Sequence, residues 1–217
     1  MPDFAQRRMM MVDTQVRPSD VTKFPIIDAM LAVPREAYVP TALREAAYVG
    51  ENIALGPNRV VLDPRTLAKM LDALDIQLSE MVLLLGAGLG YSAAVIARLA
   101  EVVIAVEEDA AMAAEAERTL SAEGVDNAMV MTAALTAGAA KHGPYDVIVI
   151  EGGVEQVPDA ILAQLKDGGR IAALYMNQGV GVVRTGMRRA GAMSWRHAFN
   201  ASAPVLPGFG RTRVFAL

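Results

Sequence analysis

The sequence predicts an α/β fold built on a doubly wound, mostly parallel sheet, and three observations support this class. After residue 80, short apolar runs of strand length alternate with segments of helical composition, which is the order that parallel sheets require. Val82 to Leu85 and Val102 to Val106 are apolar throughout, as expected for strands covered on both faces. Glycines at 86, 88 and 90 turn the chain sharply between the first of these strands and the helix that follows.

The first 75 residues are expected to form a helical extension that packs on a second, compact unit of residues 76–217. Asp63 and Pro64 are an N-cap and first-turn pair for the last helix of this extension. The expected helices and turns cover residues 3–16, 25–32, 33–36, 40–46 and 65–74, and residues 51–61 are expected to form a loop.

The second unit is expected to carry the sheet. Its helices are predicted over residues 92–100, 109–123 and 158–166. Its strands are predicted over residues 82–85, 102–106, 128–132, 145–150, 170–175, 180–184 and 214–217. The last two strands are expected to form an antiparallel pair at the sheet edge.

Composition limits the classes of function. A net charge of −4 and a pI near 5.3 argue against a general nucleic-acid binder. Because the chain has no cysteine and only two histidines, disulfides, thiol nucleophiles and a metal site are not expected. No secretory signal is visible, and the uncharged stretch from Met81 to Ala97 is short and broken by glycines. A cytoplasmic protein without a membrane partner is therefore expected, while its oligomeric state stays open.

The glycine turn and an acidic residue after the next strand together indicate a nucleoside-binding site. Glu107 follows the second strand, at the sheet edge where a carboxylate can accept hydrogen bonds from two ribose hydroxyls. Tyr91 stands where a dinucleotide fingerprint would have its third glycine, which disfavours a nicotinamide-dependent reductase. A turn that only packs a helix on a sheet is the structural alternative, and the placement of Glu107 argues against it.

Several short motifs occur in one collinear order. They are Arg8 to Val12 with Gln15-Val16, Ala29-Met30, Val33 to Pro40, Ala47-Tyr48, Gly56, Gly86 to Tyr91, Val106-Glu107 with Asp109, Gly143 to Asp146, Val157-Pro158 and Leu165 to Arg170. In this order the sequence resembles the protein-L-isoaspartate O-methyltransferase family over nearly its whole length.

The resemblance implies a Rossmann-like methyltransferase fold that uses S-adenosylmethionine as its cofactor. It implies transfer of a methyl group to a carboxylate, on isoaspartyl residues of damaged proteins or peptides in a repair step, or on a small carboxylate. It also implies that Gly86, Ala87, Gly88 and Gly90 shape the cofactor turn, that Glu107 binds the ribose, and that the backbone near Ala133 lies along the adenine. The loop from Gly56 to Leu62 is implied to cover the methyl group on the substrate side.

Two segments depart from the family pattern. Val60-Val61-Leu62 stand where the family carries Thr-Ile-Ser, so two hydroxyls are absent. Thr132-Ala133-Ala134 stand where the family carries Gly-Asp-Gly, so the carboxylate that faces the adenine is absent. These losses leave the catalytic residues unassigned. They support an alternative: a weakened or inactive relative that binds S-adenosylmethionine, S-adenosylhomocysteine or a protein partner.

Two charged residues in this region carry hypotheses. Arg59 directly precedes the altered segment, and its guanidinium can hold an acceptor carboxylate through two parallel hydrogen bonds. The alternative is a solvent-facing arginine in a loop. Glu151 follows the strand that ends at Ile150, and it can contact the methionine end of the cofactor or the acceptor. The alternative is a structural cap on the turn at Gly152-Gly153.

Overall fold

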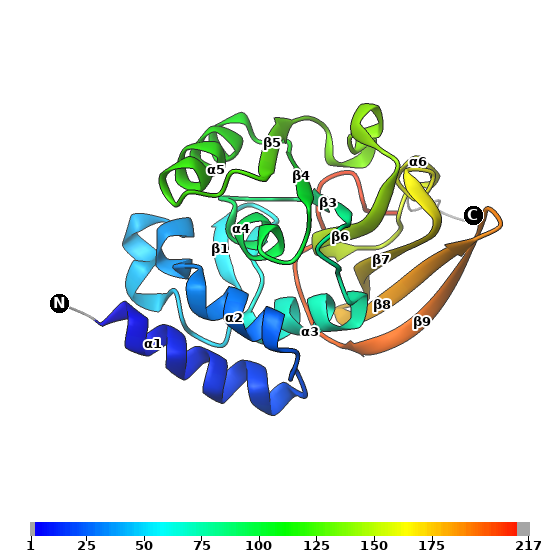
Figure 1. Cartoon of the computed structure of the whole chain (residues 1–217). Coiled ribbons are helices and arrows are strands. Elements are labelled where there is room, and N and C mark those ends of the chain that lie inside the picture. The colour runs from blue at the N-terminus through cyan, green and yellow to red at the C-terminus, as the bar shows by residue number, and fades with distance from the viewer. Residues whose placement is uncertain (1–2, 212–217) are drawn as a thin grey trace.

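A seven-stranded sheet runs through the molecule in the computed structural model, which describes residues 3–211 (Figure 1). The strands are β3 (Met81–Leu85), β4 (Val102–Glu107), β5 (Ala128–Thr132), β6 (Tyr145–Val154), β7 (Leu165–Asn177), β8 (Val180–Arg189) and β9 (Ala192–Asn200). Their order across the sheet is β5-β4-β3-β6-β7-β8-β9. The first five pair in parallel, and β8 and β9 add an antiparallel edge. The predicted fold class is therefore confirmed.

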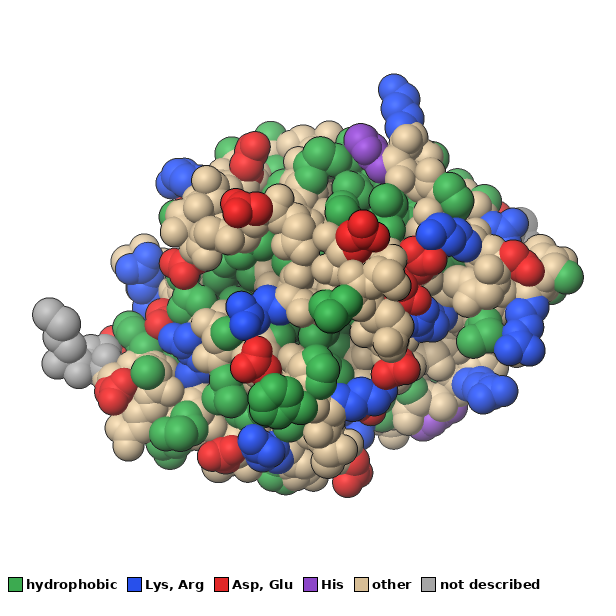
Figure 2. Space-filling view, in the orientation of Figure 1, with side chains coloured by type: hydrophobic (Ala, Val, Ile, Leu, Met, Phe, Trp, Pro, Cys, Tyr) green, Lys and Arg blue, Asp and Glu red, His purple; other side chains and the backbone are tan. Residues whose placement is uncertain are grey.

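The composition of the antiparallel edge differs from the prediction. The pair that forms it is β8 with β9, and β9 was not predicted at all. The strand predicted over residues 214–217 lies outside the described residues. Residues 180–200 contain four arginines and no acidic residue, and basic side chains gather at this end of the molecule in Figure 2.

Both faces of the sheet are covered, and neighbouring residues of β3 point to opposite faces. Val82 and Leu84 pack in one core cluster with the helices α3 (Pro64–Leu74), α4 (Tyr91–Ala97) and α5 (Ala110–Ala122). Leu83 and Leu85 pack in a second cluster on the other face, with the short helix α6 (Asp159–Leu162) and the segment 205–209. This double cover explains why the central strands read as continuous apolar runs.

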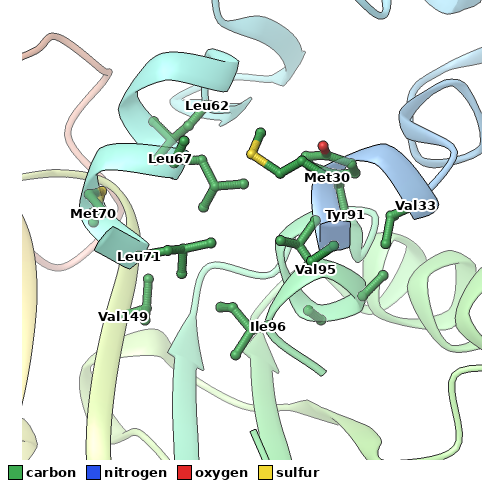
Figure 3. Close-up of a cluster of buried hydrophobic side chains, with 14 of the residues drawn as sticks. Met30, Val33, Leu62, Leu67, Met70, Leu71, Tyr91, Val95, Ile96 and Val149 are labelled. Atoms are coloured by element: carbon green, nitrogen blue, oxygen red, sulfur yellow. The ribbon is translucent and has the colours of Figure 1, made fainter. Parts of the chain in front are cut away.

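The N-terminal residues pack into the first of these clusters. They form α1 (Phe4–Met11), a π-helical turn η1 (Val12–Val16), η2 (Arg17–Ser19), α2 (Phe24–Ala32), η3 (Arg35–Tyr38) and η4 (Thr41–Ala46). Figure 3 shows side chains of α2 and α3 converging with those of α4 in this cluster, among them Met30, Leu67 and Val95. The helices that frame the start of the chain are thus held directly on the sheet domain.

The loop predicted over residues 51–61 is wrong, because a hairpin forms there. Strands β1 (Ile53–Gly56) and β2 (Arg59–Val61) pair antiparallel. Pro57 and Asn58 occupy the two central turn positions, and Asn58 adopts a left-handed φ of 57°. Proline followed by asparagine suits a turn whose second central residue needs positive φ. The turn joins strands of four and three residues, which are too short for an apolar pattern to predict them.

Two helices are shorter than predicted. Helix α4 ends at Ala97 rather than at residue 100, and α6 is a single turn in place of a helix over 158–166. Leu165 already pairs with Tyr145 of β6, so the residues that follow α6 belong to β7. Pairing with the sheet overrides the helical composition of this segment. Within residues 3–211, the structure contains no helix with the length and apolar character needed to span a bilayer.

Candidate active site

The carboxyl ends of β3, β4 and β6 bring the glycine turn and two buried carboxylates together. The amides of Gly86 and Ala87 donate to the carbonyl of Val106, over 2.9 and 3.2 Å, so the turn is tied to the end of β4. Gly86, Gly88 and Gly90 have φ values of 86°, 55° and 97°. This left-handed backbone favours glycine at all three positions.

Glu107 is fully buried at the end of β4. One carboxylate oxygen, Oε2, accepts the amide of Gly88 at 2.7 Å, and Oε1 accepts the amide of Asp109 at 3.0 Å. Oε2 also forms an ion pair with Nη2 of Arg59. The side chain expected to bind ribose is thus placed beside the glycine turn, with part of its acceptor capacity already used.

Arg59 begins β2 and reaches the carboxyl edge of the sheet from the hairpin. Its side chain is 6% exposed, so the alternative of a solvent-facing arginine is wrong. Only Nη2 has a partner, since Nε and Nη1 are buried without a hydrogen bond to any part of the described chain. The structure therefore directs one edge of the guanidinium to Glu107 and leaves the other donors unpaired.

Glu151 lies within β6, next to the irregular pairing between β6 and β7. It is 3% exposed, and its Oε2 atom has no hydrogen-bond partner among residues 3–211. Burial raises the pKa of Glu151 to about 7, although nearby Ser92, Arg35 and Arg59 act in the opposite direction. A carboxyl group with this pKa exchanges its proton near neutral pH.

Arg35 is a functional-region residue that the sequence reasoning missed. It is fully buried, and its guanidinium donates to the carbonyls of Ala47 at 2.7 Å and of Leu62 at 2.8 Å. The same group lies 4.6 Å from the centre of the Tyr91 ring. The signal available in the sequence was an arginine inside the Val33 to Pro40 motif, beside Glu36. In the structure Glu36 pairs with Arg8 instead.

The altered segment Val60-Val61-Leu62 is a packing segment. Val60 and Val61 are buried, and Leu62 is fully buried. Figure 3 shows the Leu62 side chain beside Leu67 in the main core cluster. The apolar residues that replace the family's hydroxyls are thus part of the core, and the carbonyl of Leu62 holds Arg35.

The hairpin that carries Arg59 lies over the glycine turn. A Cβ atom at Gly88 would come within 2.7 Å of Cδ1 of Leu55, so the hairpin contacts the turn closely. On the other side of Glu107, the amide of Ala133 donates to the Glu107 carbonyl at 3.1 Å. Ala133 therefore lies directly beside the ribose-binding candidate.

Metal ligands do not gather anywhere in the part of the chain that the structure describes. No group of three or more histidine, cysteine, aspartate or glutamate residues is placed to hold an ion there.

Comparisons with known proteins agree with this architecture. Residues 7–188 match the family model described as protein-L-isoaspartate(D-aspartate) O-methyltransferase. The protein-L-isoaspartate O-methyltransferase of Syntrophus aciditrophicus (strain SB) is 36% identical over 171 residues, covering 79% of this chain and 78% of the relative. The enzyme of the same name from Methylorubrum extorquens (strain PA1) is 37% identical over 175 residues, covering 78% of this chain and 74% of the relative.

Solved structures support the same fold. A protein-L-isoaspartate O-methyltransferase superposes with a TM-score of 0.80 at 21% identity, covering 95% of this chain and 67% of that one. A structure named as a putative protein-L-isoaspartate O-methyltransferase from Plasmodium falciparum, in complex with S-adenosyl-L-homocysteine, superposes with a TM-score of 0.79 at 14% identity. The match covers 95% of this chain and 99% of that one. Since the family model spans most of the sequence and both relatives exceed 30% identity over more than three quarters of it, the chain belongs to the protein-L-isoaspartate(D-aspartate) O-methyltransferase family.

Proposed function

We propose that this protein is an S-adenosylmethionine-dependent O-methyltransferase that methylates the carboxylate of isoaspartyl residues in damaged proteins. The observation that carries the proposal is the family match over residues 7–188, which includes the glycine turn and Glu107. We also propose that the enzyme acts in the cytoplasm, since a chain without cysteine needs no oxidising compartment to form disulfides.

The residues at the carboxyl edge of the sheet fit this cofactor. Glu107 offers a buried carboxylate for ribose hydroxyls, and Gly86, Gly88 and Gly90 bring backbone rather than side chains to the turn. Ala133, next to Glu107, supplies backbone for the adenine side. Glu151 supplies a carboxylate for the cationic amino group at the methionine end, which would lower its raised pKa.

The chemistry asks little of the protein beyond positioning. When bound, S-adenosylmethionine would supply a methyl group on a positively charged sulfur. A carboxylate oxygen can attack that methyl carbon directly, so that the new C–O bond forms as the C–S bond breaks and neutral S-adenosylhomocysteine leaves. The acceptor carboxylate is already ionised at neutral pH, so this chain need not supply a general base. Its residues hold the acceptor in line and exclude water. In well-oriented systems such positioning lowers the activation barrier by on the order of 7–11 kcal/mol.

Arg59 is the candidate for holding the acceptor. Its Nε and Nη1 atoms are buried and unpaired within residues 3–211. Either of them can donate to a carboxylate in parallel with Nη2 once Nη2 is released from Glu107. The guanidinium would take over the positioning that hydroxyls of the family's Thr-Ile-Ser segment provide. Arg59→Ala should therefore raise the KM for an isoaspartyl peptide, and unchanged transfer to every tested carboxylate would remove this role.

A second function is favoured by one observation. Leu62 and Val61 are core residues, so neither contributes a polar group to an acceptor. A relative that binds S-adenosylmethionine or S-adenosylhomocysteine without methyl transfer, or that binds a protein partner, needs no polar group at these positions. Apolar residues there would leave its binding function intact.

The deciding experiment follows tritium from S-adenosyl[methyl-³H]methionine into a base-labile ester on an isoaspartyl peptide. The same peptide with a normal aspartyl residue is the substrate control. Glu107→Gln should abolish transfer, whereas Glu101→Gln, an exposed change just before β4, should leave it intact. Label in the isoaspartyl peptide alone would support the proposed enzyme, and cofactor binding by calorimetry without any transfer would support the binding protein instead.

A further inference from the structure

We propose that Arg59 competes with the cofactor ribose for Glu107 and thereby sets how tightly this chain binds its cofactor. The inference rests on the proposed function, because it concerns the same cofactor. It goes beyond that function because one side chain of the hairpin, Arg59, controls the affinity for the cofactor.

The first argument is the number of acceptor positions on Glu107. A carboxylate offers about four lone-pair sites, and three are used by Gly88, Asp109 and Arg59. Two ribose hydroxyls would need two acceptor sites. The amides of Gly88 and Asp109 belong to the backbone around the site, whereas the Arg59 side chain can rotate away. Arg59 is therefore the partner that ribose would replace.

The second argument is that Arg59 is only partly satisfied where it lies. One of its nitrogens binds Glu107, and the other two are buried without partners in the described chain. A guanidinium has five N–H donors, so most of its hydrogen-bonding capacity is unused. Moving the side chain away breaks one hydrogen-bonded ion pair and weakens the attraction to the Glu151 carboxylate, but it breaks no other side-chain hydrogen bond. A ligand that supplies new partners can offset this cost.

The third argument is the construction of the hairpin that carries Arg59. At its base, the side-chain Nδ2 of Asn52 donates to the carbonyl of Ser202 at 2.7 Å, and the side-chain Oδ1 of Asn52 accepts the backbone amide of Asp63 at 2.8 Å. Val61 is anchored in the core, while the turn residues 56–58 are exposed. The base is thus fixed, and the exposed tip is held to the core through the partly buried Leu55. A shift of the tip that moves Leu55 would therefore move Arg59 with it, without unfolding the strand pair.

The contact between Leu55 and Gly88 strengthens this assignment. The same hairpin covers the turn that must admit the cofactor, with Leu55 so near Gly88 that a Cβ atom there would clash with it. Displacement of Arg59 and opening of the glycine turn therefore require one movement. The apparent affinity for cofactor is the intrinsic affinity multiplied by the fraction of molecules in which this movement has occurred, so a small open fraction weakens binding.

Calorimetric titration with S-adenosylhomocysteine tests the proposal on the full chain. We expect Arg59→Gln to bind at least tenfold more tightly than the wild type, and Glu107→Gln to lose binding with or without the Arg59 change. Arg170→Gln is the matched control, since it removes a second partly buried ion pair, with Glu80, at the other end of the strands. It should bind as the wild type does.

The outcomes separate the two proposals. Binding by Arg59→Gln that equals or falls below that of the wild type overturns the competition and leaves the enzyme proposal standing. Binding by Arg59→Gln when the wild type shows none supports the competition. No binding by either protein overturns both. If Arg59→Gln does not fold, a crystal structure of the wild type with S-adenosylhomocysteine decides: ribose oxygens on Glu107 with Arg59 displaced support the proposal, and an intact Arg59–Glu107 pair overturns it.

Discussion

Glu151 combines a position at the carboxyl edge of the sheet with almost complete burial. Its pKa is raised from 4.5 to about 7, mainly by burial, while Arg35 and Arg59 limit the rise. For a carboxyl raised in the folded state, the stabilising contribution is complete below the unfolded pKa and is lost as the pH rises through the folded one. The protein should therefore lose stability through Glu151 between about pH 4.5 and pH 7.

Glu151→Gln should remove this pH dependence. Between pH 5 and pH 8, the free energy of unfolding of the wild type should fall relative to that of the variant by up to about 3 kcal/mol. Urea unfolding of both proteins at pH 5, 6, 7 and 8 measures the difference. Parallel curves across this range would mean that the carboxyl group is ionised throughout, and the assignment would be wrong.

Arg35 connects segments that surround the site, because its guanidinium donates to two backbone carbonyls and lies over the ring of Tyr91. Lysine keeps the charge but cannot reproduce the planar fork that reaches Ala47 and Leu62 together. Arg35→Lys should lower the free energy of unfolding by roughly 2–4 kcal/mol. Urea unfolding measures it, and the exposed Arg44→Lys is the control, for which a change within about 0.5 kcal/mol is expected.

At the scale of single residues, part of the site was predictable from the sequence. Glu107 and the glycines could be placed because the order of strand, turn, helix and strand determines where the carboxyl edge lies. The pairing of Arg59 with Glu107 could not be predicted, since it depends on a hairpin that brings residues 48 positions apart into contact. Arg35 was missed for the same reason, because its partners lie 12 and 27 positions away.

At the scale of elements, the hairpin β1–β2 determines whether the residues that depart from the family pattern face the site or the core. Its second strand leads Val60, Val61 and Leu62 into the core. The sequence showed that hydroxyls are absent there, but whether the apolar residues line a pocket or fill the core depends on tertiary packing. The same dependence explains why β9 and the early start of β7 were missed, since each is held by pairing with a neighbouring strand.

Restoring the family's serine at position 62 should therefore harm the protein. Leu62→Ser removes a fully buried side chain and adds a hydroxyl to the core, so we expect a loss of roughly 3–5 kcal/mol in the free energy of unfolding. Methyl transfer per folded molecule should not increase. Leu78→Ser, at a leucine that is 75% exposed, is the matched control and should change stability little. A faster enzyme with serine at position 62 would show that this side chain reaches the acceptor.

At the scale of the whole molecule, the site joins parts of the chain that are far apart in sequence. The N-terminal helices and the sheet share one core cluster, and the hairpin between them touches the glycine turn. Arg59 and Glu107 tie the hairpin to the end of β4. Ligand binding at this edge should thus stabilise the entire fold against unfolding, and not the glycine turn alone.

Cofactor binding should stabilise the molecule as a unit. A ligand that binds only the folded state at 100 times its Kd adds about 2.7 kcal/mol to the free energy of unfolding, which corresponds to roughly 5–10 °C in Tm for a domain of this size. S-adenosylhomocysteine should give one shifted thermal transition, seen equally by circular dichroism and by the fluorescence of Trp195 on β9. Glu107→Gln should show no shift, whereas Glu101→Gln should shift as the wild type does. Because Trp195 lies on an edge strand remote in sequence from the glycine turn, a shift seen by circular dichroism but not by fluorescence would mean that the C-terminal strands unfold independently of the cofactor site.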